Sequence, residues 1–261
     1  MVQNKIVLIG AGNVATHLGK ALQDAGYHIA QIYSRTETSA SALGNLLGVA
    51  YTTSLDTVCT DADIYVVALK DSVLQSLLPS IVKGRESALF VHTAGSLPMD
   101  VWKCYACHYG VLYPMQTFSK HRKVDFVNVP FFVEANGMVE FEFLKRVASS
   151  LSPKVYEINS EQRKYLHMAA VFACNFTNHM YALCDQLLSE HDIPFEVMIP
   201  LIDETARKVH DLKPVEAQTG PAVRYDENVI NYHLSMLQDK PDMCDLYERI
   251  SKSIHKTNDK L

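Results

Sequence analysis

A glycine-rich turn directly after a short apolar segment constrains the fold of this chain more than any other feature. Ile6–Ile9 reads as a strand, and Gly10-x-Gly12-x-x-Ala15 and an alanine-rich helical pattern follow it. The first glycine allows the tight turn, the second lets the backbone approach phosphate oxygens, and the small alanine lets the helix pack near the strand. The pattern predicts a dinucleotide site; the alternative is a glycine-rich turn without a ligand. The residues expected to hold the pyrophosphate are Gly10, Gly12, Asn13 and Val14.

The end of the second predicted strand, Tyr27–Tyr33, indicates which dinucleotide binds. An NAD site usually carries Asp or Glu there, because a carboxylate accepts from the ribose 2′-hydroxyl. This chain has Ser34, Arg35 and Thr36 instead. A guanidinium suits a 2′-phosphate, and a charge-assisted bond contributes about 1.5–3 kcal/mol. We therefore expect NADP(H) to be favoured over NAD(H) by roughly tenfold to a hundredfold. The other interpretation is a solvated arginine that starts the next helix.

Length and composition agree with a soluble intracellular enzyme but do not identify one. The 261 residues are 48% hydrophobic, enough for a core in one or two domains. The net charge of −5 and the lack of a Lys/Arg-rich run argue against a nucleic-acid or anionic-membrane partner. The apolar segment before Gly10 is too short for a signal peptide, and no stretch approaches 18 apolar residues. We expect a cytoplasmic protein with reduced cysteines.

Two patterns that suggest a metal or haem are rejected. Cys104-Tyr-Ala-Cys107-His108 matches the spacing for c-type haem, but no export signal and no second C-x-x-C accompany it. We expect two half-buried cysteines beside a strand. The histidines share no short spacing and have no carboxylate companion, so no metal site is predicted. The histidines considered are His17, His92, His108 and His167.

Apolar runs alternate with helical patterns through the first 155 residues, as in β-α-β units. The predicted strands are Ile6–Ile9, Ile29–Tyr33, Ile64–Leu69, Leu89–His92 and Val129–Val133. The predicted helices are Val14–Ala25, Ser39–Leu47, Val73–Val82 and Met138–Leu151, then Glu161–Glu190, Glu196–Asp211, Asn228–Gln238 and Met243–Ser253. We therefore expect an α/β protein: a Rossmann-type, doubly wound, mostly parallel sheet in residues 1–155, followed by an all-α domain in residues 156–261.

Polar residues follow two further predicted strands. Open α/β sheets bind ligands at the carboxyl ends of their strands, so Leu69, Lys70 and Thr93 are expected to contact the coenzyme. Gly95 permits close approach of a nicotinamide or substrate. In the alternative, Asp71 or Ser72 simply caps the next helix.

The long predicted helix carries the candidate chemistry. His167 and Asn175 are eight residues apart and share one face of a regular helix. An imidazole that titrates near neutral pH can protonate a carbonyl or imine, and an amide can orient it. The alternative is a core or subunit-interface histidine; Tyr165 is a weaker substitute acid. Further on, Arg224 and Asp226 follow a Gly-Pro turn. In one interpretation they form part of a site together with His233. In the other, Asp226 caps the next helix and Arg224 pairs with it.

Several segments, taken together and in order, resemble a known family. These are Gly10–Ala15, His92–Ser96, Tyr113-Pro-Met-Gln-Thr-Phe118, Tyr165–Ala170 with Asn175, and Thr219–Arg224 with Asp226 and His233. The chain resembles Rossmann-like proteins, labelled NADP oxidoreductases, whose helical C-terminal half is catalogued as a domain of unknown function. Its first half is also similar to deazaflavin-dependent NADP oxidoreductases and pyrroline-carboxylate reductases, within the 6-phosphogluconate dehydrogenase-like group. The resemblance implies a homodimer joined through the helical domain, with the active site between domains. Two residues depart from the pattern: Tyr113 replaces His, and Tyr225 replaces Gly.

These observations predict an NADP(H)-dependent oxidoreductase that transfers hydride to or from a small carbonyl, imine or hydroxy compound in the interdomain cleft. His167 is the expected acid and Asn175 its orienting partner. A non-catalytic NADP-binding sensor or scaffold dimer is the alternative, because the long helix lacks a Lys-x-x-x-Asn pair. Hydride exchange with a deazaflavin would need a second cofactor groove, which nothing in residues 156–261 indicates.

Overall fold

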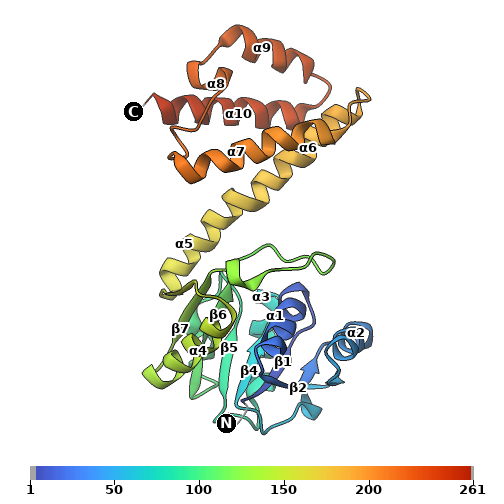
Figure 1. Cartoon of the computed structure of the whole chain (residues 1–261), viewed down its shortest axis with the longest axis vertical. Helices are drawn as coiled ribbons and strands as arrows, with labels where there is room; N and C mark the ends of the chain where they lie inside the picture. Colours follow the sequence, from blue (N-terminus) through green and yellow to red (C-terminus); the bar gives the residue numbers. More distant parts are fainter. Residues whose placement is uncertain (1–3, 260–261) are drawn as a thin grey trace. The chain divides into compact units, whose positions relative to one another are not determined.

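The computed structural model describes residues 4–259, and the chain divides into two compact units between Cys174 and Asn175 (Figure 1). The first unit contains every described strand, and the second contains only helical elements. The predicted helical domain begins at residue 156. The first turns of its long helix, α5 (Ser160–Ala170), nevertheless lie within the first compact unit.

Within residues 4–259 the strands form one eight-stranded sheet in the order β3-β2-β1-β4-β5-β6-β7-β8. The strands are β1 (Lys5–Ile9), β2 (His28–Tyr33), β3 (Ala50–Thr52), β4 (Ile64–Val67), β5 (Leu89–His92), β6 (His108–Pro114), β7 (Phe131–Ala135) and β8 (Val155–Glu157). All neighbouring pairs are parallel except β6 with β7. The strand order reverses between β1 and β4, which is where doubly wound sheets bind ligands. The predicted Rossmann-like, mostly parallel fold is confirmed.

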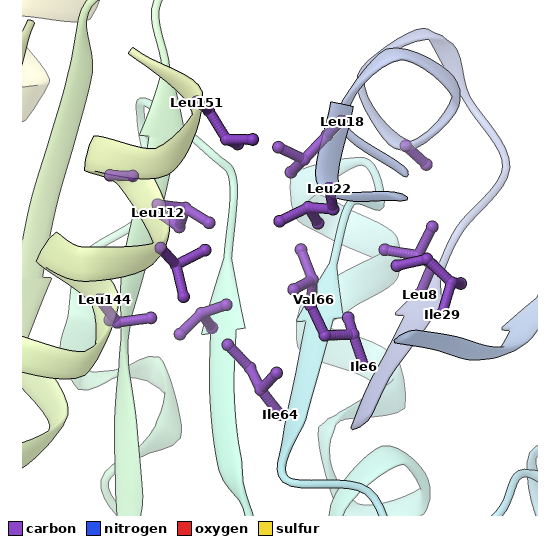
Figure 2. Packing of buried hydrophobic residues seen from close by; sticks show 14 of the residues in the cluster. Ile6, Leu8, Leu18, Leu22, Ile29, Ile64, Val66, Leu112, Leu144 and Leu151 are labelled. Carbon is purple, nitrogen blue, oxygen red and sulfur yellow. The ribbon is translucent and has the colours of Figure 1, made fainter. Parts of the chain in front are cut away.

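Helices cover both faces of this sheet, which explains why its central strands are apolar throughout. On β1, Ile6 and Leu8 join one buried cluster while Val7 and Ile9 join the other, because side chains alternate along a strand. Leu18 and Leu22 of α1 pack in the first cluster with Leu144 and Leu151 of α4, as Figure 2 shows. The helices of this unit before α5 are α1 (Asn13–Asp24), α2 (Glu37–Leu47), α3 (Asp71–Val82) and α4 (Met138–Leu151).

Three strands were missed by the sequence prediction, and one of them is central. β6 carries His108, Gly110 and Pro114, which break both the alternating and the continuous apolar pattern. Gly110 is required there, because an added Cβ would lie 2.5 Å from the Glu134 carbonyl oxygen of β7. The other two, β3 and β8, are three-residue edge strands. The predicted Val129–Val133 strand begins two residues later, at Phe131.

The second unit is a set of helices with little internal core. Its elements are α6 (Thr177–Ser189), η5 (Phe195–Met198), α7 (Ile199–Asp211), α8 (Pro221–Arg224), α9 (Glu227–Met236) and α10 (Pro241–Asn258). The predicted helices are thus confirmed with shifted ends. Asp226 caps α9 by accepting a hydrogen bond from the Val229 amide, at 3.3 Å. Tyr225 adopts the left-handed region, with φ 49°, at the position where the resemblance has glycine. Of the helices described, none has the length and apolar character of a membrane span.

Candidate active site

The glycine turn after β1 has the geometry of an anion cradle. Gly10 has φ 125°, and a Cβ there would lie 2.4 Å from the Ala68 carbonyl oxygen, so only glycine fits. A Cβ on Gly12, the N-cap of α1, would meet no described atom within 4 Å. Among the described residues, no side chain caps the N-terminus of α1, and the first turn of this helix contains no acidic residue. The backbone N–H groups at the start of α1 therefore face open space, which fits a pyrophosphate.

Asn13 has a second role that its spacing did not predict. Its side-chain amide donates to the Phe118 carbonyl at 2.7 Å, and His17 Nε2 lies 2.9 Å from the Ser119 carbonyl oxygen. These contacts hold the loop that follows β6 against the first turns of α1. The Asn13 side-chain amide is therefore engaged within the chain, which leaves its backbone N–H as its free donor at the start of α1. Val14 is half-buried beside it.

The three residues after β2 present an unpaired guanidinium. Arg35 is exposed and has no ion-pair partner among residues 4–259. Ser34 is buried and its N–H donates to the Thr52 carbonyl at 3.1 Å. Thr36 is the N-cap of α2, but its hydroxyl does not cap the helix. A free guanidinium beside hydroxyl groups suits a dianionic phosphate.

The turns after β4 and β5 lie beside the glycine turn. Val67 pairs with Ile9 on one side and His92 on the other, so the carboxyl ends of β1, β4 and β5 are adjacent. Leu69 is half-buried and Lys70 is exposed, while Thr93 is buried and its N–H donates to the Val67 carbonyl at 3.2 Å.

The alternative interpretation of Asp71 or Ser72 as the cap of α3 is wrong. Lys70 is its N-cap, so neither Asp71 nor Ser72 caps the helix. The Asp71 carboxylate instead accepts from the Ser96 hydroxyl. This bond ties the turn after β4 to the turn after β5.

His92 and His167 lie near the same sheet edge but differ in burial. His92 is fully buried, its Nδ1 accepts from the Ala94 N–H at 3.2 Å, and its ring stacks on Trp102 at 6.4 Å between centroids. Burial lowers the pKa of His92 to about 3, with the positive charge of Arg163 acting in the same direction. His92 is therefore neutral near pH 7 and serves packing.

His167 lies at the carboxyl edge of the sheet, as its proposed role requires. It is half-buried on α5, and a Cβ at Gly95 would lie 2.6 Å from its Nδ1 atom. The Tyr113 hydroxyl at the end of β6 lies 3.3 Å from the same nitrogen. The structure thus brings together His167, the Gly95 turn and Tyr113. From the sequence alone, Tyr113 is only a departure from the family pattern.

A buried ion pair holds α5 against the sheet. Arg163 is 1% exposed; its Nη1 pairs with the Glu134 carboxylate of β7, and its Nη2 donates to the Leu97 carbonyl at 2.5 Å. The Glu134 carboxylate also accepts from the Ser160 N–H at 2.9 Å. Sequence reasoning missed this ion pair. The available signal was the position of Arg163, which precedes His167 by one helical turn.

Asn175 cannot be assigned to the face of His167 from its spacing. A π-helical segment, η4 (Val171–Phe176), separates them, and i→i+5 hydrogen bonding changes the angular period of the helix. Asn175 is exposed, and it begins the second unit. Tyr165 is 68% exposed.

Other candidate clusters do not assemble as the sequence suggested. Cys104 and Cys107 are exposed rather than half-buried. His233 Nδ1 contacts the Tyr247 hydroxyl at 2.8 Å, Asp226 caps a helix, and Arg224 makes no ion pair within the described chain. Across residues 4–259, no three or more His, Cys, Asp or Glu residues are arranged to bind a metal.

Two family models match the chain. Residues 5–94 match the family "NADP oxidoreductase coenzyme F420-dependent", and residues 129–254 match "Domain of unknown function (DUF2520)". A Bacteroides fragilis protein described as a "putative NADP oxidoreductase" is 60% identical, with a TM-score of 0.94 over 97% of this chain and 98% of that one. No curated protein matches the chain.

Two more distant structures share the fold. A pyrroline carboxylate reductase from Plasmodium falciparum, solved with NADP bound, is 13% identical over 98% of this chain and 99% of that one, with a TM-score of 0.61. An imine reductase from Myxococcus stipitatus, solved with NADP+, is 16% identical over 98% of this chain and 93% of that one, with a TM-score of 0.67. The chain belongs to the NADP oxidoreductase family in which a domain of the coenzyme F420-dependent type is followed by DUF2520.

Proposed function

We propose that this protein is an NADP(H)-dependent oxidoreductase of a small carbonyl, imine or hydroxy compound. The observation that carries the proposal is the position of His167, which lies against Gly95 at the same sheet edge as the glycine turn of β1. A coenzyme cradle and a proton-exchanging side chain at one edge are the two parts that a hydride-transfer site needs.

The coenzyme contacts follow from the groups at that edge. The N–H groups of Gly12, Asn13 and Val14 bind the pyrophosphate, with Gly10 making the turn. Arg35 pairs with the 2′-phosphate, which the hydroxyls of Ser34 and Thr36 support. Leu69, Lys70 and Thr93 line the adjacent turns. The relatives solved with NADP, although distant in sequence, support the choice of coenzyme.

The reaction needs a proton as well as a hydride. NADPH supplies the hydride when it is bound. His167 donates a proton to the carbonyl oxygen or imine nitrogen, because an imidazole can carry a proton near neutral pH. Asn175 begins the second unit beyond the π-helical segment, so we propose no role for it in this step. In the direction of oxidation His167 accepts the proton instead.

Removing the Arg35 guanidinium is expected to weaken NADPH binding selectively. In Arg35→Ala the dissociation constant for NADPH rises tenfold to a hundredfold, because a bond to a charged group contributes about 1.5–3 kcal/mol. NADH, which lacks the 2′-phosphate, binds as it does to the wild type. Fluorescence titration with both coenzymes measures the ratio. Lys20→Ala removes an exposed cation from α1 and serves as the control; an equal loss for NADH and NADPH would contradict the assignment.

A substrate screen tests the reaction itself. Purified protein is mixed with NADPH and a library of small aldehydes, ketones and cyclic imines, and absorbance at the reduced-coenzyme band is followed. Small hydroxy compounds and amines with NADP+ test the reverse direction. We expect turnover with at least one of these compound classes. Tight NADPH binding without turnover on any compound would favour the sensor or scaffold, and no binding of either pyridine coenzyme would reject the proposal.

We also propose that a second copy of this chain covers the helical unit. Within the described helices, α6 and α7 contain no buried residue, and Val197, Leu201 and Val209 are at least half exposed. So much apolar surface on a unit with a small core calls for a partner. The resemblance, which implies a homodimer joined through this region, supports a second copy as that partner.

Placing a charged side chain on this apolar surface is expected to separate the subunits. The wild type should show twice the chain mass of 29.3 kDa in light scattering. Leu201→Glu should raise the dimer dissociation constant at least tenfold, since the interface would have to bury an unpaired carboxylate. Lys256→Glu changes an exposed charge on α10 and should leave the dimer intact. A monomeric wild type at micromolar concentration would contradict this second proposal.

A further inference from the structure

We infer that Tyr113 is a positioning residue for His167. Its hydroxyl forms a hydrogen bond with Nδ1 in both protonation states of the imidazole. Nε2 is then the nitrogen that exchanges a proton with substrate. The inference rests on the proposed function, since it names how the proposed acid is held. The contact itself can be tested without any substrate.

The geometry confines the imidazole between two neighbours. The Tyr113 hydroxyl lies 3.3 Å from Nδ1, and the two rings meet edge to face with centroids 6.3 Å apart. Gly95 bounds the imidazole as well, because a Cβ there would lie 2.6 Å from Nδ1 and 2.8 Å from Cγ. Tyr113 is itself held by Phe132, whose ring centroid is 6.2 Å from its own. Rotation of the imidazole is therefore restricted.

A hydroxyl can hold Nδ1 in either state because it both donates and accepts. In the imidazolium, the Nδ1 proton is donated to the Tyr113 oxygen. When the substrate oxygen or nitrogen takes the proton from Nε2, the Nε2–H bond breaks and its electron pair remains on Nε2. The neutral imidazole keeps its Nδ1–H bond to Tyr113. Should the imidazole instead carry its proton on Nε2, the Tyr113 hydroxyl reorients and donates to Nδ1. The phenol proton is never transferred.

The surroundings keep the phenol neutral and the helix in place. Burial raises the pKa of Tyr113, and the opposing positive charge of Arg163 has the smaller effect, so the hydroxyl stays protonated near pH 7. Arg163 lies one helical turn before His167 and is clamped to Glu134 and Leu97. The ring of His167 is thus fixed both through its own helix and through β6.

Tyr113→Phe tests the inference by removing one oxygen atom. Protein labelled with 15N-histidine is studied by multiple-bond 1H–15N NMR, and the His167 signals are identified by their loss in His167→Gln. In the wild type we expect a single set of ring-nitrogen shifts with Nδ1 in a hydrogen bond. In Tyr113→Phe the Nδ1 shift should move by several ppm. With a substrate from the screen, kcat should fall about tenfold, while KM and the NADPH dissociation constant stay within twofold.

Tyr156→Phe is the matched control. Tyr156 packs on the same Phe132 ring, at 5.5 Å between centroids, so this variant removes a hydroxyl from the neighbouring tyrosine. We expect its His167 spectrum and its turnover to match the wild type. An unchanged Nδ1 signal in Tyr113→Phe would overturn the inference, as would wild-type kcat, and either result leaves the proposed function standing. Absence of turnover in the wild type would reject the function, while the spectra still decide the contact.

Discussion

Arg163→Met is expected to lower the free energy of unfolding by about 3–5 kcal/mol, the usual cost of removing one partner of a buried ion pair. Arg163 is 1% exposed, and its guanidinium joins Glu134 of β7 to the Leu97 carbonyl and the first turn of α5. The variant leaves the Glu134 carboxylate, 14% exposed, without a counter-charge. Urea denaturation at one fixed protein concentration measures the loss, because the stability of the proposed dimer would depend on concentration.

Two further variants separate the ion pair from the loss of a long side chain. Arg146→Met removes an exposed arginine from α4 and should change the free energy of unfolding by no more than about 0.5 kcal/mol. The double variant Arg163→Met/Glu134→Gln removes the charge that Arg163→Met leaves unpaired, so it should recover part of the loss. An Arg163→Met protein as stable as Arg146→Met would show that the Arg163–Glu134 ion pair does not stabilise the folded state.

The parts of this site that the sequence predicted are local in the chain. The Gly10 turn and the N-terminus of α1 are adjacent in sequence, and their residue types follow directly from backbone geometry. Arg35 follows β2 by two residues, so a strand prediction is enough to place it. His167 was identified by its residue type and its spacing from Asn175 rather than by any contact.

The missed parts depend on contacts between distant residues. Glu134 and Arg163 are 29 residues apart, and Tyr113 and His167 are 54 apart. Tyr113 lies on β6, which was not recognised as a strand, and Glu134 lies on β7 just beyond the end of the predicted Val129–Val133 strand. Burial also could not be read from spacing, so His92 and His167 looked alike although only His92 is fully enclosed. A π-helical segment such as η4 leaves no periodic signature.

Removing the imidazole of His167 is expected to reduce kcat a hundredfold to ten-thousandfold on any substrate found in the screen, the range for loss of a general acid. The NADPH dissociation constant should stay within twofold, because the groups proposed to bind the phosphates, at Gly12 and Arg35, are untouched. Stopped-flow oxidation of NADPH at saturating substrate measures the step directly. His167→Gln should lose as much as His167→Ala, since an amide can bond to Tyr113 but cannot deliver a proton at neutral pH.

The size of this effect separates the two roles that His167 can have. His179→Ala removes an exposed histidine from α6 and should keep wild-type kcat. If His167 only packs against Gly95 and Tyr113, then His167→Ala would lower stability and leave kcat of the folded fraction unchanged. Thermal unfolding of the same samples distinguishes these cases, because a general acid can be lost without a matching loss of stability. Wild-type kcat in folded His167→Ala would therefore assign the proton transfer to another group.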